Sequence, residues 1–145
     1  METLLELGHM RLEKDGKLAW VTFTRESQLN AMNNEGTEQI NRVVMALSED
    51  PDIRVAVIRG QGRAFCTGID LKELAADSID MSYHERWEKA LRILENMEKV
   101  IVVGMHGFCL GGALQLAMAC DIRVGTPDCQ IGLPAIRESI LPKLQ

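Results

Sequence analysis

Two glycine-containing segments have the residue types that could bind an oxygen atom with backbone groups alone. The first is RAFCTGIDLK, residues 63–72, and the second is HGFCLGGALQ, residues 106–115. Each follows a strand-like apolar run and leads into a helix-like segment, whose first N–H groups have no intrahelical partner. Glycine lets the backbone approach a ligand closely. One such turn also suits simple strand–helix packing. Two turns aimed at one point would give a single oxygen two N–H donors, the arrangement that stabilises a thioester enolate.

The N-terminal third has the pattern of a β-hairpin followed by a helix. Residues 9–13 and 18–24 are strand-like and flank the turn pair Asp15-Gly16, and residues 28–34 predict a loop. Asn34 or Thr37 could cap the helix that follows, and Asp50-Pro51 would end it. Its apolar positions, which share one helical face, are Ile40, Val43, Val44 and Leu47.

The rest of the chain predicts short strands that alternate with helices. Residues 55–58, 100–103 and 122–124 are β-branched runs that predict buried strands, and residues 130–132 predict one more short strand. Amphipathic or apolar helices are predicted at 82–98 and 113–119. This alternation predicts an α/β architecture with right-handed crossovers, in a single domain over residues 1–145.

Composition excludes several classes of function. The formal net charge of −5 argues against non-specific nucleic-acid binding, and no apolar run is long enough to span a membrane. The N-terminus lacks a basic-then-apolar signal pattern, and we expect reduced cysteines, no metal site and a cytoplasmic location. The cysteines and histidines, which show no ligand spacing, are Cys66, Cys109, Cys120, Cys129, His9, His84 and His106.

In order along the chain, these motifs resemble those of the crotonase family, also called the enoyl-CoA hydratase/isomerase family. RAFCTGIDLKEL is similar to its first signature, in which a turn of small residues and a glycine precede Ala-Asp-Leu/Ile-Lys. HGFCLGGALQLAMACDIRV is similar to the second, N-G-x-x-x-G-G-G-x-E-L-A-x-x-C-D. The hairpin, the loop at residues 30–32 (NAM) and the DPDIRVAVIRG strand also fit. The resemblance implies a crotonase-like ββα spiral, an acyl-CoA partner, a role in fatty acid metabolism and no cofactor apart from the CoA of the substrate.

The resemblance also assigns roles by position. The N–H groups of Ile69 and Gly112 match the two oxyanion-hole donors of the family. The stretch Ile69, Asp70, Leu71 and Lys72 matches the segment that lines the CoA thioester. Lys72 could lie near the nucleotide or pantetheine portion, or it could be an ordinary solvated lysine.

The chain departs from the family at both catalytic glutamates. Gln115 stands at the first position and Ala135 at the second. Glutamine has no basic form near neutral pH and alanine has no polar group, so neither can transfer the proton that hydration requires. Gln115 could still orient a water or a carbonyl, and Glu138, three residues after Ala135, could act as the acid or base. Other polar residues near the signatures have structural explanations: Asp70 as a helix cap, Glu73 and His84 on exposed faces, and His106 bonded to the glycine-rich turn.

Two classes of function remain open at this point. One is an enzyme, a lyase, isomerase or hydrolase, that acts on an acyl-CoA by hydrolysis, decarboxylation or C–C chemistry. The other is a non-catalytic CoA-binding or scaffolding protein of the same fold; an ordinary hydratase would require a different register at Gln115. Fold analogy cannot choose among them. In the family, the C-terminal helices that follow the ILP at residues 140–142 cover the active site and make most of the trimer contacts. We therefore expect a truncated chain with uncovered apolar surface, and a trimer or dimer of trimers at full length.

Overall fold

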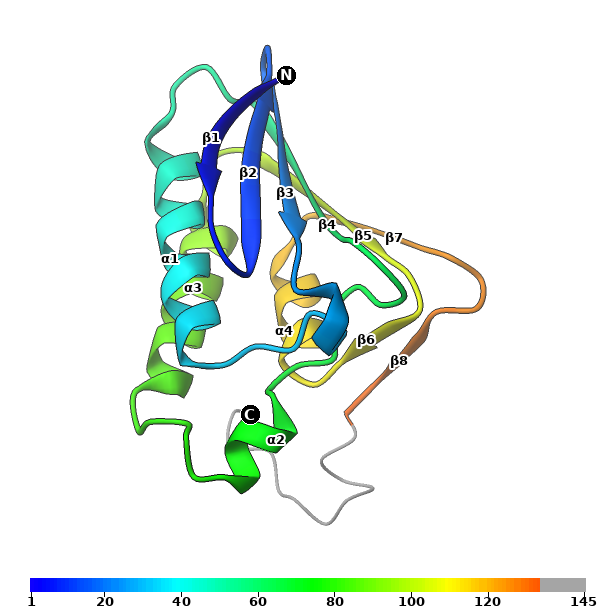
Figure 1. Ribbon diagram of the computed structural model, residues 1–145. Helices are drawn as coiled ribbons and strands as arrows, with labels where there is room; N and C mark the ends of the chain where they lie inside the picture. The colour runs from blue at the N-terminus through cyan, green and yellow to red at the C-terminus, as the bar shows by residue number, and fades with distance from the viewer. Residues whose placement is uncertain (134–145) are drawn as a thin grey trace.

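The chain folds as a mixed sheet with helices packed against it in a computed structural model that describes residues 1–133 (Figure 1). The main sheet has six strands in the order β1-β2-β3-β4-β5-β7. Their bounds are β1 (Glu2–Glu6), β2 (Met10–Asp15), β3 (Leu18–Phe23), β4 (Val55–Gly60), β5 (Val100–Met105) and β7 (Ile122–Gly125). A second sheet pairs β6 (Phe108–Leu110) with β8 (Gln130–Gly132).

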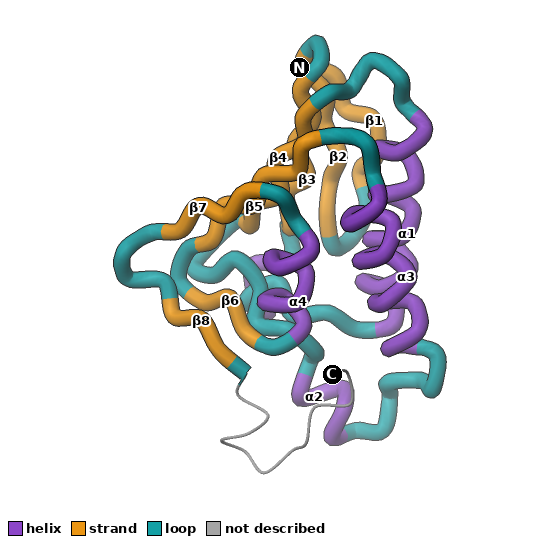
Figure 2. The backbone as a smooth tube through the Cα atoms, turned by 180° about the vertical axis from the view of Figure 1, so that it is seen from behind, coloured by secondary structure: helices purple, strands orange, loops and turns teal. Residues whose placement is uncertain are grey.

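Helices connect the parallel strands. The 3-10 helix η1 (Glu26–Gln28) and α1 (Asn34–Glu49) lie between β3 and β4. Two helices, α2 (Leu71–Ala75) and α3 (Tyr83–Asn96), lie between β4 and β5, and α4 (Gly112–Ala119) follows β6. Helices α1 and α3 lie side by side, and α3 also packs on α4 (Figures 1 and 2). None of the helices within residues 1–133 combines the length and the apolar character needed to cross a membrane.

The sheet changes from antiparallel to parallel pairing at β3. Strands β1, β2 and β3 pair antiparallel, whereas β3, β4, β5 and β7 are all parallel. The predicted hairpin around Asp15-Gly16 and the predicted parallel strands are therefore confirmed, as is the α/β class. Val100, at the start of β5, is exposed and not buried as predicted. The core lies between the sheet and helices α1, α3 and α4, and the four apolar positions predicted on α1 are all buried.

Two local predictions were wrong, and one strand was not predicted. The cap of α1 is Asn33, whose side chain accepts the Gly36 N–H at 3.0 Å, and not Asn34 or Thr37. The strand predicted at 122–124 forms as β7 but is exposed, because it is an edge strand that pairs only with β5 in the described part of the chain. Strand β1 was not predicted; it is an edge strand, and its sequence has no clear alternation of polar and apolar residues.

Apolar side chains are exposed over α4, β7 and β8. This agrees with the expectation of uncovered apolar surface near the end of the chain. The exposed residues, with relative exposures of 42–66%, are Met118, Ile122, Val124, Ile131 and Leu133.

Candidate functional site

The two glycine-containing segments lie side by side, as the sequence predicted. Cys66 and Cys109 form an isolated parallel bridge between them. The Cys66 N–H donates to the Phe108 carbonyl at 3.1 Å, and the Leu110 N–H donates to the Cys66 carbonyl at 3.2 Å. These bonds bring the glycine-containing turns of the two segments close together in the fold.

Gly68 sets how closely the two turns approach each other. Its φ of +88° is in the left-handed region, which side chains other than glycine rarely adopt. A Cβ at this position would lie 2.9 Å from the Leu110 carbonyl oxygen and 3.4 Å from the Gly112 nitrogen. Glycine is therefore required on two grounds, and its contacts place the first turn directly against the Gly112 N–H.

The N–H groups of Ile69 and Gly112 donate no hydrogen bond within residues 1–133. Gly112 is the first residue of α4, where an N–H has no intrahelical acceptor. Both residues are half-buried. The site therefore has two unpartnered N–H donors in adjacent turns, which is what an oxyanion site needs. Their convergence on one oxygen stays a prediction.

Met32, in the NAM loop, fixes the direction of the Ile69 backbone. The Met32 N–H donates to the Gly68 carbonyl and the Met32 carbonyl accepts the Asp70 N–H, both at 2.7 Å. Met32 and Ile69 thus form a parallel bridge, in which Met32 bonds to the residues on either side of Ile69, while the N–H of Ile69 itself is directed to the opposite side. The Ile69 N–H therefore points away from Met32.

Arg25, which sequence reasoning did not single out, anchors the segment after Ile69. Its guanidinium lies 3.0 Å from the Asp70 carboxylate and 3.3 Å from that of Glu73. Asp70 is buried and caps α2, accepting the N–H groups of Lys72 and Glu73. Burial raises the pKa of Asp70, but the hydrogen bonds from the Glu73 N–H and from Arg25 outweigh it and hold the pKa below its usual value.

This network changes the interpretation of two acidic residues. The cap predicted at Asp70 is confirmed, and its carboxylate is occupied by Arg25 and the helix. Glu73 does not lie on a fully exposed face as expected; it is half-buried and also accepts the Asn33 side-chain amide at 2.8 Å. Neither carboxylate is free to act as a general base.

The remaining candidates of the site differ in their surroundings. Gln115 lies on α4 one turn after Gly112, half-buried, and its side chain has no hydrogen-bond partner in the described part of the chain. Leu71 and Lys72 are exposed on α2, and the Lys72 ammonium has no ion-pair partner among residues 1–133. Ala135 and Glu138 lie outside the described residues.

The hydrogen bond expected of His106 is present but has a different partner. Its Nε2 lies 2.6 Å from the carbonyl oxygen of Gly62, in the loop before the first turn, and not from the turn that follows it. His106 therefore links the two segments. His84 is half-buried on α3, where its ring lies nearly perpendicular to that of Tyr83.

The cysteines are free thiols, as predicted. Cys66, Cys109 and Cys120 are buried, and burial raises their pKa values to about 12, 11 and 12. These thiols stay protonated at neutral pH, so they are not the nucleophile of the site. No group of three or more His, Cys, Asp or Glu side chains within residues 1–133 is arranged to hold a metal ion.

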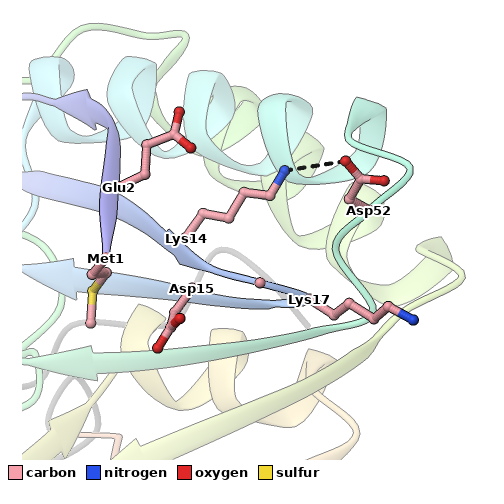
Figure 3. Close-up of a pocket in the computed structure, with 7 residues that line it drawn as sticks. Met1, Glu2, Lys14, Asp15, Lys17 and Asp52 are labelled. Atoms are coloured by element: carbon pink, nitrogen blue, oxygen red, sulfur yellow. Dashed lines mark ion pairs between the residues drawn. The ribbon is translucent and has the colours of Figure 1, made fainter.

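An open hollow lies elsewhere, at the tip of the β2–β3 hairpin (Figure 3). It has a volume of about 680 Å³, and an ion pair between Lys14 and Asp52, 3.6 Å apart, lies at its side. The residues that line it are Met1, Glu2, Lys14, Asp15, Gly16, Lys17 and Asp52. None of them belongs to the two glycine-containing turns. It is therefore not part of the candidate site.

Known proteins resemble this chain in sequence and fold. The sequence model described as "Enoyl-CoA hydratase/isomerase" matches residues 13–144. The chain is 32% identical over 141 residues to the short-chain-enoyl-CoA hydratase of Clostridium acetobutylicum, covering 95% of this chain and 54% of that protein. It is 33% identical over 135 residues to the crotonyl-CoA hydratase of Syntrophomonas wolfei, covering 90% and 52%.

The structural comparison agrees. The crystal structure of an enoyl-CoA hydratase/carnithine racemase from Magnetospirillum magneticum superposes with a TM-score of 0.86 and 28% identity, over 94% of this chain and 53% of that one. The predicted crotonase-like fold is confirmed. The chain spans about half the length of the relatives it matches.

Proposed function

Because the chain belongs to the enoyl-CoA hydratase/isomerase family, we propose that it binds an acyl-CoA thioester through the N–H groups of Ile69 and Gly112. The observation that carries this proposal is the contact between the two turns. The turns are so close that a Cβ on Gly68 would lie 3.4 Å from the Gly112 nitrogen. The N–H groups of Ile69 and Gly112 have no partner within residues 1–133. In the proposed complex the thioester oxygen accepts both N–H groups, and no cofactor is needed.

The chemistry proposed for this site is stabilisation of negative charge on the thioester oxygen. Donors that are oriented before the reaction stabilise an enolate or a tetrahedral oxyanion without reorganising. Gln115 cannot serve as a base, so we propose a reaction other than simple hydration, with Gln115 orienting a water or a substrate carbonyl. Glu138 remains the proposed acid or base.

A second candidate function is CoA-ester binding without catalysis. It is favoured by the acidic residues next to the site: Asp70 and Glu73 are both held by Arg25. A carboxylate paired in this way is a poor proton acceptor.

Incubation of the protein with a panel of acyl-CoAs, followed by mass spectrometry, separates these functions. Release of free CoA identifies a hydrolase, loss of CO2 a decarboxylase, and any other new acyl mass another lyase. An acyl-CoA of unchanged mass but altered retention time identifies an isomerase. Tight binding in calorimetry without turnover identifies the scaffold. A folded protein that binds no acyl-CoA would contradict the proposal as a whole.

We also propose that the full-length protein is a trimer or dimer of trimers and that it is located in the cytoplasm. The exposed apolar side chains on α4, β7 and β8 favour association. Sedimentation velocity tests the association directly, and a stable monomer at micromolar concentration would contradict it.

A further inference from the structure

The thiol of Cys66 makes two hydrogen bonds in the first glycine-containing turn. Its Sγ donates to the Asn30 carbonyl oxygen, 3.1 Å away, and accepts the N–H of Gly68, whose nitrogen is 3.4 Å away. The side chain is fully buried, and burial raises the pKa of the thiol to about 12. The proton needed for donation therefore stays on the sulfur at neutral pH. Cys66 thus joins the NAM loop to the turn through its side chain.

The Asn30 end of this link is itself held on both sides. The Asn30 N–H donates to the Arg25 carbonyl at 3.0 Å. Its buried side-chain amide donates to the carbonyl oxygens of Gln61 at 3.0 Å and Ala64 at 2.9 Å. Both of these acceptors lie in the segment that leads from β4 into the turn. The carbonyl that accepts the Cys66 thiol therefore belongs to a residue that is fixed relative to the turn.

The Gly68 end of the link lies one peptide group before the Ile69 N–H. The N–H of Gly68 is held by Cys66. The next peptide group, which contains the Ile69 N–H, is held at the Gly68 carbonyl by the Met32 N–H, 2.7 Å away. In a trans peptide the N–H points opposite to the C=O, so the direction of this second group sets the direction of the Ile69 N–H. Glycine alone restricts neither of its backbone angles, so the two hydrogen bonds fix how the two peptide groups are oriented.

We infer that Cys66 is a positioning residue for the proposed oxyanion site, and that its thiol holds the Gly68 N–H and so fixes the direction of the Ile69 N–H. The thiol does not touch the substrate, and no covalent bond forms or breaks at the sulfur. This inference rests on the proposed function, because it assumes that the Ile69 N–H donates to the thioester oxygen.

Cys109 offers a matched control for the loss of a buried thiol. It is the partner of Cys66 in the parallel bridge, and both side chains are fully buried. The Cys109 thiol, however, makes no hydrogen bond to any of residues 1–133. Replacing either cysteine by alanine therefore removes the same atom at the same depth, but only the change at Cys66 removes hydrogen bonds.

Calorimetric titration of the variants with acetyl-CoA and with free CoA tests the inference. Free CoA has no thioester carbonyl, so the ratio of the two affinities separates an effect on the oxyanion site from a general loss of fold. Cys66→Ala should lower this ratio about fivefold, because the Ile69 N–H is no longer held in direction. Cys66→Ser is close to alanine in volume and restores a donor and an acceptor, so it should recover most of the ratio. Cys109→Ala should leave the ratio unchanged.

Three results would overturn the inference: an unchanged ratio in Cys66→Ala, an equal fall in Cys109→Ala, or a Cys66→Ser variant no better than Cys66→Ala. A different result separates the proposed function from the inference. If the unmodified chain binds acetyl-CoA no more tightly than free CoA, it is the proposed function that fails.

A measurement on the unmodified chain covers the case in which Cys66→Ala does not fold. The N–H groups of Phe65 and Cys66 donate to backbone carbonyls at 2.9 and 3.1 Å. In hydrogen exchange followed by NMR, the Gly68 N–H should exchange with deuterium as slowly as these two. Exchange of the Gly68 N–H at the rate of an unstructured peptide would refute the inference.

Discussion

Replacing Gly68 by alanine should separate the two turns on which the site depends. The new Cβ would lie 2.9 Å from the Leu110 carbonyl oxygen, closer than such atoms can stay, so one of the backbones must move. Gly16→Ala is a matched control. Gly16 also has a positive φ, +62°, but a Cβ there meets nothing within 4 Å. The control therefore introduces backbone strain without a steric contact and lies far from the site.

The two variants should differ in the free energy of unfolding. Strain from a positive φ costs about 1–2 kcal/mol, and this is the whole effect expected for Gly16→Ala. At Gly68 the overlap with the neighbouring backbone adds roughly 1–3 kcal/mol, the usual range for overpacking. Separation of the turns also removes about one hydrogen bond to the bound thioester, so the affinity for an acyl-CoA should fall roughly tenfold.

Urea unfolding followed by circular dichroism gives the stability of each variant, and calorimetry with butyryl-CoA gives the affinity. We expect Gly16→Ala to bind the ester as the unmodified chain does. The reasoning is refuted if Gly68→Ala loses no more stability than Gly16→Ala and retains full affinity.

Three further predictions concern charge and protonation. Arg25→Met leaves the buried Asp70 carboxylate unpaired; it should lower the free energy of unfolding by roughly 3 kcal/mol at pH 7, and adding Asp70→Asn should recover part of this in urea unfolding. Burial lowers the pKa of His9, so the folded chain takes up its proton less readily than the unfolded chain. Stability should be full above about pH 6.5 and fall below it, and a His9→Gln variant that keeps the same slope in urea titrations would contradict this. Ellman's reagent should label the half-buried Cys129 before the three buried thiols, Cys66, Cys109 and Cys120. A different order of labelling would count against their burial.

Local patterns in the sequence predicted the elements and turns of the site. The apolar face of α1, the cap at Asp70 and the glycine turns all depend on residues within a few positions of one another. The sequence predicted a glycine-containing turn at Gly68, and its φ of +88° agrees with this, whereas its contact with the second turn is known only from the structure. These features have a physical signature in the sequence itself.

Long-range partners had no such signature. Arg25 lies 45 residues before Asp70, and nothing in its local sequence distinguishes it from a surface arginine. Trp87 lies in the helix predicted at residues 82–98, and its contact with Gly112 depends on how α3 packs on α4. The exposure of β7 likewise depends on its place at the edge of the sheet, because its β-branched sequence alone predicts burial.

The central claim is that the N–H groups of Ile69 and Gly112 donate to one thioester oxygen. Proton–nitrogen NMR spectra of the labelled chain, titrated with acetyl-CoA and separately with free CoA, test it most directly. Free CoA has no thioester carbonyl, so it controls for binding of the nucleotide and pantetheine. The account predicts that acetyl-CoA moves both amide proton signals downfield and that free CoA does not. Signals that stay in place at saturation with acetyl-CoA, or that move equally with free CoA, would contradict it.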